Sequence, residues 1–205
     1  NSSNNDWCLT QDIDAANALL DGLGYVDSDG DGVREAEGYG PLEFDYVTST
    51  NAVRQSNQEL IASYWEEIGV KANMLNADAS LFFDGTCASD DCIWKFFYPM
   101  QMYTNGSSSA YAGSYMNGFT CDKIPTSATS WGGENIPRIN NPELDALIDE
   151  MVAAPVGDER IALVTQANDL VSSTGVIPLI YRANNSAFAN SIEGVGELNG
   201  WDSEY

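Results

Sequence analysis

Apolar and polar residues follow two different periods in the first part of the chain. In residues 12–23 and 52–68, apolar side chains recur every three or four positions, which predicts two helices, and Asp12 can cap the first of them. In residues 42–48 and 70–75, apolar and polar residues alternate, which predicts two strands. A strand, a long helix and a second strand in this order predict a βαβ unit with parallel strands.

The second part of the chain contains further strand and helix patterns. Residues 92–98 and 176–182 are apolar enough for strands buried on both faces, although Pro178 favours a place at the edge of a sheet. A helix is predicted to begin at Pro142, with an apolar stripe on one face, and a second helix covers residues 158–173.

Residues 99–140 have no regular period and are rich in Gly, Ser, Asn and Tyr. A segment of that length without a helical or strand pattern commonly carries function. Aromatic side chains in and beside it suit a cleft that binds a ligand through apolar area, although the same rings could pack as core beneath the loop. The aromatic residues in question are Phe97, Tyr98, Tyr103, Tyr111, Tyr115 and Trp131, of which Tyr98 and Trp131 fit a cleft best.

The run DSDGDGVRE at residues 27–35 has the spacing of a calcium-binding loop. Calcium takes about six to eight oxygen ligands, and an EF-hand loop supplies them from alternate positions, with glycine at about its sixth. Gly32 stands at that position, but Gly38 replaces the final glutamate of the pattern. The alternative is an acidic, turn-rich loop without a metal. The predicted ligands of a structural Ca²⁺ are Asp27, Asp29, Asp31, the Val33 carbonyl and Glu35.

Charge and composition exclude several classes of function. The chain has 31 acidic and 8 basic residues and a net charge of −23, so it would repel nucleic acids and anionic lipid. It has no histidine, which removes histidine-dependent nucleophiles and histidine-ligated zinc. No pair of carboxylates is recognisable from spacing, so an enzyme is not expected. Two alternative functions remain open: a secreted hydrolase that uses two carboxylates, and a calcium-stabilised surface or adhesion domain.

The chain has four cysteines, and an even number in such a polar chain indicates an oxidising compartment. Cys87 and Cys92 bracket a short segment that a disulfide could close, which would leave Cys8 to pair with Cys121. Free thiols are the alternative. No apolar stretch is long enough to predict a membrane-spanning helix.

Four segments, taken together and in order, resemble family 5 solute-binding proteins, the dipeptide- and oligopeptide-binding receptors of ABC importers. They read DIDAANALLDGLGYVDSDGDGVREAEGYGPLEFDYVT, NQELIASYWEEIGVKANML, NPELDALIDEM and the stretch from Asp158 to Tyr181 that ends in VIPLIY. Family members are commonly more than twice as long as this chain and consist of two lobes. The resemblance therefore implies that residues 1–205 form a single α/β lobe, the second lobe of such a receptor.

The resemblance implies a lobe of the type II periplasmic-binding-protein-like fold, with a mixed, mostly parallel sheet flanked by helices and with its termini close together. It also implies an extracytoplasmic receptor that binds a peptide or another small solute between two lobes and delivers it to the membrane subunits of an importer. The first lobe would come from the rest of the same protein.

Peptide receptors of this family carry a tryptophan and, three residues later, an acid that pairs with the amino group of the peptide. This chain reads FFYPMQMY at residues 96–103, where Phe97 corresponds best to the tryptophan and no acid stands near Met100. The residues predicted to bind the ligand are Phe97, Tyr98, Met100, Tyr103 and Trp131.

Overall fold

The computed structural model describes residues 6, 9–106, 112–180 and 187–193. Its α-helices are α1 (Ile13–Gly22), α2 (Ala52–Glu66), α3 (Ala79–Phe82), α4 (Ala112–Met116), α5 (Pro142–Ala153) and α6 (Asp158–Thr174). Its strands are β1 (Glu35–Ala36), β2 (Gly40–Pro41), β3 (Glu43–Ser49), β4 (Lys71–Ala77) and β5 (Met100–Gln101). Short 3₁₀ helices are η2 (Ile93–Lys95), η3 (Asn117–Phe119), η4 (Cys121–Lys123) and η5 (Ser127–Thr129).

The main sheet has three strands in the order β4-β3-β5, and both pairs of neighbours are parallel. Strand β3 pairs with β4 along its whole length, from Glu43 opposite Lys71 to Ser49 opposite Ala77. Strands β1 and β2 form a separate antiparallel pair. The β3–α2–β4 unit confirms the predicted pair of parallel strands joined by a helix, and the α/β fold with a parallel sheet flanked by helices is confirmed with it.

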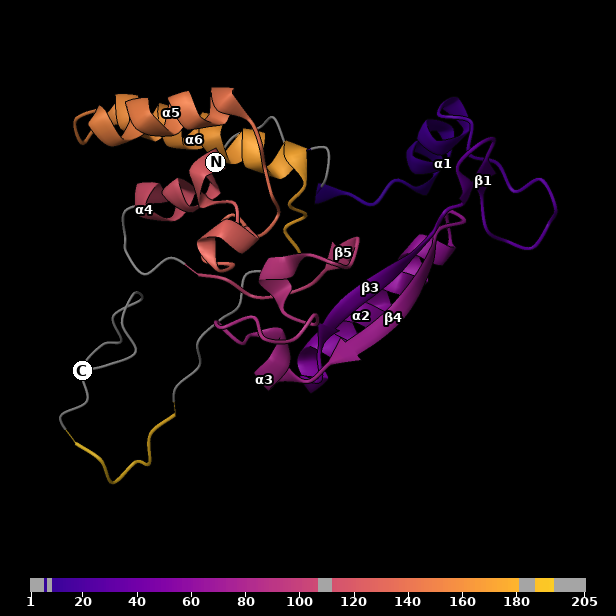
Figure 1. Ribbon diagram of the computed structural model, residues 1–205, viewed down its shortest axis with the longest axis horizontal. Helices are drawn as coiled ribbons and strands as arrows, with labels where there is room; N and C mark the ends of the chain where they lie inside the picture. The colour runs from indigo at the N-terminus through magenta and orange to yellow at the C-terminus, as the bar shows by residue number, and fades with distance from the viewer. Residues whose placement is uncertain (1–5, 7–8, 107–111, 181–186, 194–205) are drawn as a thin grey trace.

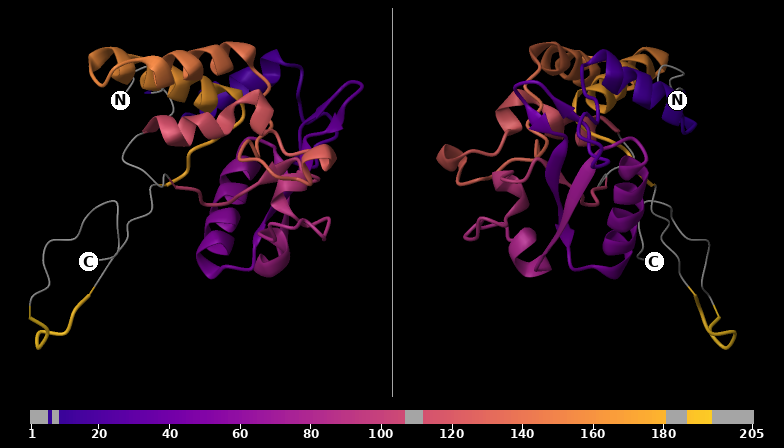
Figure 2. Two further views of the ribbon diagram at one scale, coloured as in Figure 1. Left: turned by 60° about the vertical axis from the view of Figure 1, so that its left-hand side comes forward. Right: turned by 90° about the vertical axis from the view of Figure 1, so that its right-hand side faces the viewer.

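Helix α2 covers one face of this sheet (Figure 2). It begins where the Asn51 side chain accepts hydrogen bonds from the amides of the first turn. Near its end, the Trp65 ring lies 5.3 Å from the Phe44 ring and 5.2 Å from the Tyr46 ring, measured between centroids. Gln58 is fully buried and donates to the Tyr46 carbonyl oxygen at 2.6 Å, so the polar side chain inside this interface is satisfied.

Helices α4, α5 and α6 gather on the other side of the molecule (Figure 1). The predicted stripe of α5 faces their common core, because Leu144, Ile148 and Met151 are all fully buried. In α6, Leu163 is buried in the same core, whereas Ile161 is 64% exposed. The rest of this helical core consists of Met116, Phe119, Ile139, Ala154, Ala167 and Val171.

The strand predicted over residues 92–98 is wrong. Residues Ile93–Lys95 form η2, and Phe96 follows with a φ angle of 53°, which is incompatible with an extended chain. The apolar residues of this run are buried as a tight turn next to a disulfide, with Ile93 in a core cluster beside Val47. The third strand of the sheet is instead β5, a few residues further along the chain.

The buried strand predicted over residues 176–182 is also wrong for the described residues 176–180, which form no strand. Ile177 and Ile180 are 62% and 63% exposed. An apolar pattern shows that a segment is suited to burial, but a strand also needs a neighbouring strand to pair with, and no described strand pairs with this segment. The expected closeness of the termini concerns residues outside those described.

Helix α1 begins as predicted, because the Asp12 side chain accepts a hydrogen bond from the Ala15 amide at 2.9 Å. It has no buried residue, however, and Leu19 and Leu23 are each 68% exposed. The apolar stripe that predicted this helix therefore lies at the surface. None of the described helices has the length and apolar character needed to span a membrane.

Candidate functional site

Two of the predicted ligand-binding residues, Phe97 and Trp131, lie around one lysine. The Lys95 ammonium nitrogen is 6.0 Å from the centroid of the Phe97 ring and 5.8 Å from that of Trp131. These distances allow an attraction between the cation and both rings. The Lys95 side chain is only 11% exposed, and its ammonium group pairs at 2.9 Å with the exposed carboxylate of Asp90.

Arg138 holds the two segments of this site together. Its guanidinium group donates to the Pro125 carbonyl at 2.7 Å, near the turn that carries Trp131. It also donates to the carbonyls of Trp94 at 3.0 Å and Lys95 at 3.3 Å, in the segment that carries Phe97. The turn that carries Trp131 is closed separately, because the Trp131 amide donates to the Thr126 carbonyl at 2.8 Å. Residues distant in sequence thus present their side chains at one surface.

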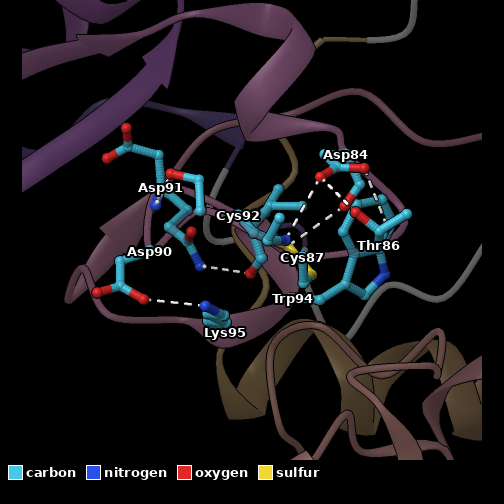
Figure 3. Close-up of a disulfide and its surroundings, with 12 residues drawn as sticks. Asp84, Thr86, Cys87, Asp90, Asp91, Cys92, Trp94 and Lys95 are labelled. Atoms are coloured by element: carbon cyan, nitrogen blue, oxygen red, sulfur yellow. Dashed lines mark hydrogen bonds and ion pairs between the residues drawn. A yellow bond between two sulfur atoms is a disulfide. The ribbon is translucent and has the colours of Figure 1, made fainter.

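A disulfide between Cys87 and Cys92 closes the segment that precedes Lys95 (Figure 3). Its two Cα atoms are 5.2 Å apart, and both cysteines are buried. Cys92 is the residue that caps η2, and Asp90 lies inside the closed ring, so the disulfide restrains both partners of the ion pair. Cys121 carries a free thiol that donates to Asn140 at 3.2 Å, and Cys8 lies outside the described residues.

The remaining predicted ligand-binding residues lie elsewhere. The Tyr98 hydroxyl donates to Asp91 at 2.8 Å, and this hydrogen bond, with burial, raises the pKa of Tyr98. Burial raises the pKa of Tyr103 to about 12, and both rings pack against the core cluster around Ile93. Met100 is half-buried in β5. A ligand-binding role for these three residues stays a prediction, while their packing is the alternative that the aromatic pattern left open.

A pocket of about 320 Å³ lies beside this region. It is lined by Asn105, Gly106, Ser114, Tyr115, Gly118, Phe119 and Glu134. The Tyr115 ring also meets the Phe119 ring edge-on, with centroids 5.4 Å apart. Tyr111, the other aromatic residue of the predicted set, lies outside the described residues.

Sequence reasoning missed Lys95, although a lysine between Trp94 and two phenylalanines is a recognisable pattern in so acidic a chain.

The acidic loop has part of the geometry predicted for a metal site. Oxygen atoms of Asp27, Asp29 and Glu35 lie within 4.8 Å of one another. Oxygens that share an ion at roughly 2.4 Å can be at most about 4.8 Å apart, so these three fit one calcium ion. The Asp31 carboxylate instead accepts a hydrogen bond from the Val33 amide at 2.8 Å.

Hydrogen bonds within the loop set its shape. Asp27 accepts from the amides of Gly30 at 2.8 Å and Gly32 at 3.0 Å, and Gly32 has a φ angle of 92° that a residue with a Cβ atom rarely adopts. Glu35 accepts from the Ser28 amide at 2.8 Å, and the Ser28 hydroxyl bonds to the same oxygen. The carboxylates are therefore already oriented by the backbone.

Arg34 fastens this loop to the rest of the protein. Its guanidinium group donates to the Ile68 carbonyl at 2.9 Å, to the Tyr25 carbonyl at 2.6 Å and to the Asn17 side chain at 2.9 Å, and it also pairs with Asp21. These contacts connect α1, the acidic loop and the turn before β4. Arg34 therefore has a structural role, which the acidic motif beside it did not predict.

Three acids near the aromatic residues have separate partners and do not pair with one another as the two carboxylates of a hydrolase would. Asp90 pairs with Lys95 and Asp91 accepts from Tyr98. Hydrogen bonds from Lys123 and then Thr120 lower the pKa of Asp122, the opposite of what a general acid requires. Each of these carboxylates has a separate structural partner, which does not favour the hydrolase alternative.

Comparisons with known proteins support the fold. No protein-family model and no curated protein sequence matches the chain. Among solved structures, the oligopeptide-binding protein of Thermus thermophilus complexed with a pentapeptide is similar with a TM-score of 0.66 and 24% identity, over 80% of this chain and 28% of that one. A mannohexaose-bound periplasmic oligopeptide-binding protein of Thermotoga maritima has a TM-score of 0.64 and 24% identity, over 79% and 29% of the two chains.

NikZ of Campylobacter jejuni in complex with Ni(L-His) has a TM-score of 0.63 and 20% identity, over 79% of this chain and 30% of that one. The fold resemblance predicted from the sequence is confirmed by these structures, two of which are oligopeptide-binding proteins. The chain spans less than a third of each of their lengths, so it corresponds in fold to one part of such a protein.

Proposed function

We propose that this chain is a ligand-binding lobe of the extracytoplasmic substrate-binding component of an ABC importer. The observation that carries the proposal is the pairing of Phe97 and Trp131 around Lys95, on a lobe whose fold is that of substrate-binding proteins. The buried Cys87–Cys92 disulfide supports a location in an oxidising compartment. The proposed role is binding and release, without a chemical step.

The ligand is a peptide or another small solute that the two rings grip through apolar area. Phe97 is 59% exposed and can lose this surface to a ligand, while the Lys95 ammonium provides a polar group for orientation. A first lobe, formed by the rest of the protein, would supply the opposite wall of the cleft and close over the ligand by hinge motion. The membrane subunits of the importer would then receive the ligand.

Calorimetric titration of the full-length protein with short peptides, oligosaccharides and a nickel–histidine complex tests this role. With the ligand that binds, we expect Trp131→Ala and Phe97→Ala to weaken affinity by about tenfold or more, as is usual for aromatic anchors. Tyr39→Ala is the matched control, because Tyr39 is a highly exposed ring in the turn between β1 and β2. Equal affinities of all three variants would exclude the aromatic pair as the binding surface.

We also propose that the acidic loop binds one structural Ca²⁺. The close approach of Asp27, Asp29 and Glu35 oxygens supports this, and Asp31 and the Val33 carbonyl would complete the site after a small rearrangement. Thermal melting with added calcium and then with a chelator is the test. A melting temperature that responds to neither would defeat the metal assignment.

A further inference from the structure

Among the described residues that line the pocket, Glu134 is the one with a formal charge, and that charge is negative. The described lining contains two aromatic rings, Tyr115 and Phe119, and no lysine or arginine. The four ion pairs found among the described residues do not involve Glu134. With a volume of about 320 Å³, the pocket is large enough for a small organic group.

The backbone holds Glu134 firmly at this pocket. On one side, Gly133 packs so closely that an added Cβ atom would overlap the Lys123 carbonyl oxygen. On the other, Asn135 is fully buried, and its side chain bonds to the backbone of Phe119, Thr120 and Ile139. The backbone position of Glu134 is therefore fixed, so the ordering that binding requires is confined to its exposed side chain.

Gly118 leaves room for the acid on the pocket floor. A Cβ atom added at Gly118 would lie 3.1 Å from the Cβ atom of Glu134, closer than most real contacts. The negative potential of Glu134 reaches the neighbouring phenols, because after burial it is a further cause that raises the pKa of Tyr115 and of Tyr103. A group that enters this pocket meets a carboxylate and aromatic rings together, the combination that attracts organic cations.

We propose that this pocket is a subsite for a primary ammonium group, which donates hydrogen bonds to the Glu134 carboxylate while its alkyl chain lies against Tyr115 and Phe119. The subsite adds a class of ligand group to the proposed binding role. It stands on the pocket alone and does not require the aromatic pair at Lys95.

Titration of the ¹⁵N-labelled chain with n-butylammonium, followed by NMR, tests the proposal. We expect concentration-dependent shifts of the Ser114, Tyr115 and Gly118 amide signals. 1-Butanol, which is uncharged and equal in length, is expected to cause none of them. Equal shifts with the two compounds would show a merely apolar pocket and would overturn the proposal.

Two variants separate a specific site from general attraction by the acidic surface. Glu134→Gln is expected to weaken butylammonium binding by about tenfold or more, because it removes a charge-assisted hydrogen bond. Glu59→Gln, on the exposed side of α2, removes one negative charge as well and is expected to leave binding unchanged. Equal effects of the two variants would contradict the assignment.

Two further variants complete the design. Gly118→Ala keeps the acid but displaces it, so it should also weaken binding, and retention of full affinity would count against the subsite. Trp131→Ala should leave the Gly118 shift intact, so a failure of the aromatic site remains distinguishable from a failure of this one. A diamine and a dipeptide, each compared with its N-acetylated form, then identify which source of ammonium binds more tightly.

Discussion

The acidic loop at residues 27–35 and the aromatic surface formed by Lys95, Phe97 and Trp131 are two candidate binding regions built in opposite ways. In the loop, all three clustered carboxylates lie within nine residues, and the hydrogen bonds that orient them come from the same segment. The aromatic surface joins residues from two segments that the hydrogen bonds of Arg138 and tertiary packing bring together. A local motif can be recognised from spacing, whereas a surface of this second kind depends on the fold.

The largest expected effect is on the free energy of unfolding and concerns Asn135, whose buried side chain holds the segment before α5 in place. Asn135→Ala leaves the carbonyls of Phe119, Thr120 and Ile139 without their buried donor. We expect a loss of about 3 kcal/mol in the free energy of unfolding, because each unsatisfied buried group costs about 1–3 kcal/mol. Urea denaturation measures it, with Asn168→Ala on the exposed face of α6 as control. Equal midpoints would show that this segment does not need Asn135.

Calcium bound at the acidic loop should increase the free energy of unfolding. At a calcium concentration of about one hundred times the dissociation constant, we expect a stabilisation of about 2.7 kcal/mol. Asp29→Asn should abolish most of it, whereas Asp31→Asn should abolish less, because Asp31 lies outside the oxygen cluster. Differential scanning calorimetry with and without calcium compares them. A larger loss in the Asp31 variant would mean that the loop rearranges completely around the ion.

Removal of the disulfide should loosen the aromatic surface specifically. For the double variant Cys87→Ser and Cys92→Ser, we expect a loss of about 2 kcal/mol in stability, the chain-entropy value for so short a ring. Binding at Phe97 should weaken as well, because Asp90 and η2 lose their restraint. Denaturation and ligand titration measure the two effects. Cys121→Ser is the control, since Cys121 is a free thiol.

The smallest expected effect is a pH dependence of stability that comes from Asp84, just before the segment closed by the disulfide. Hydrogen bonds from the Thr86 hydroxyl and amide lower the pKa of Asp84 from its ordinary value of 3.8. A lowered pKa in the folded state contributes stability that is present above the unfolded pKa and is lost as the pH falls through the folded one. Below pH about 4, Asp84→Asn should therefore lose less stability than the parent chain. Thermal melting from pH about 6 to 2 measures this, and parallel curves would exclude the contribution.

The sequence predicted the regular elements where a local pattern determined them. Helices α1, α2, α5 and α6 and the parallel pair β3–β4 all form near the predicted residues. The apolar run at residues 92–98 misled the strand prediction, because apolarity reports burial and not backbone conformation. A disulfide and the left-handed backbone of Phe96 decide the conformation there, and neither has a periodic pattern.

The sites could be predicted only in part, for the same reason. Proximity of Asp27, Asp29 and Glu35 follows from spacing. The placement of Phe97 and Trp131 around Lys95, and the pocket at Glu134, become visible only when segments distant in sequence are placed together. Tyr98 and Tyr103 pack against the core cluster that contains Ile93, and a ligand-binding role for them stays a prediction.

Strand β4 stands at one border of the parallel sheet and pairs only with β3 among the described strands. The Leu75 carbonyl accepts hydrogen bonds from the side chains of Gln58 and Asn76, both at 3.1 Å. No described strand covers this border, and Met74 and Leu75 are exposed beside it. Lys71 is the sole charged side chain of the strand, and Glu43 neutralises it at 3.1 Å. We expect preparations of this chain at high concentration to self-associate through that border, and Leu75→Lys to keep them monomeric.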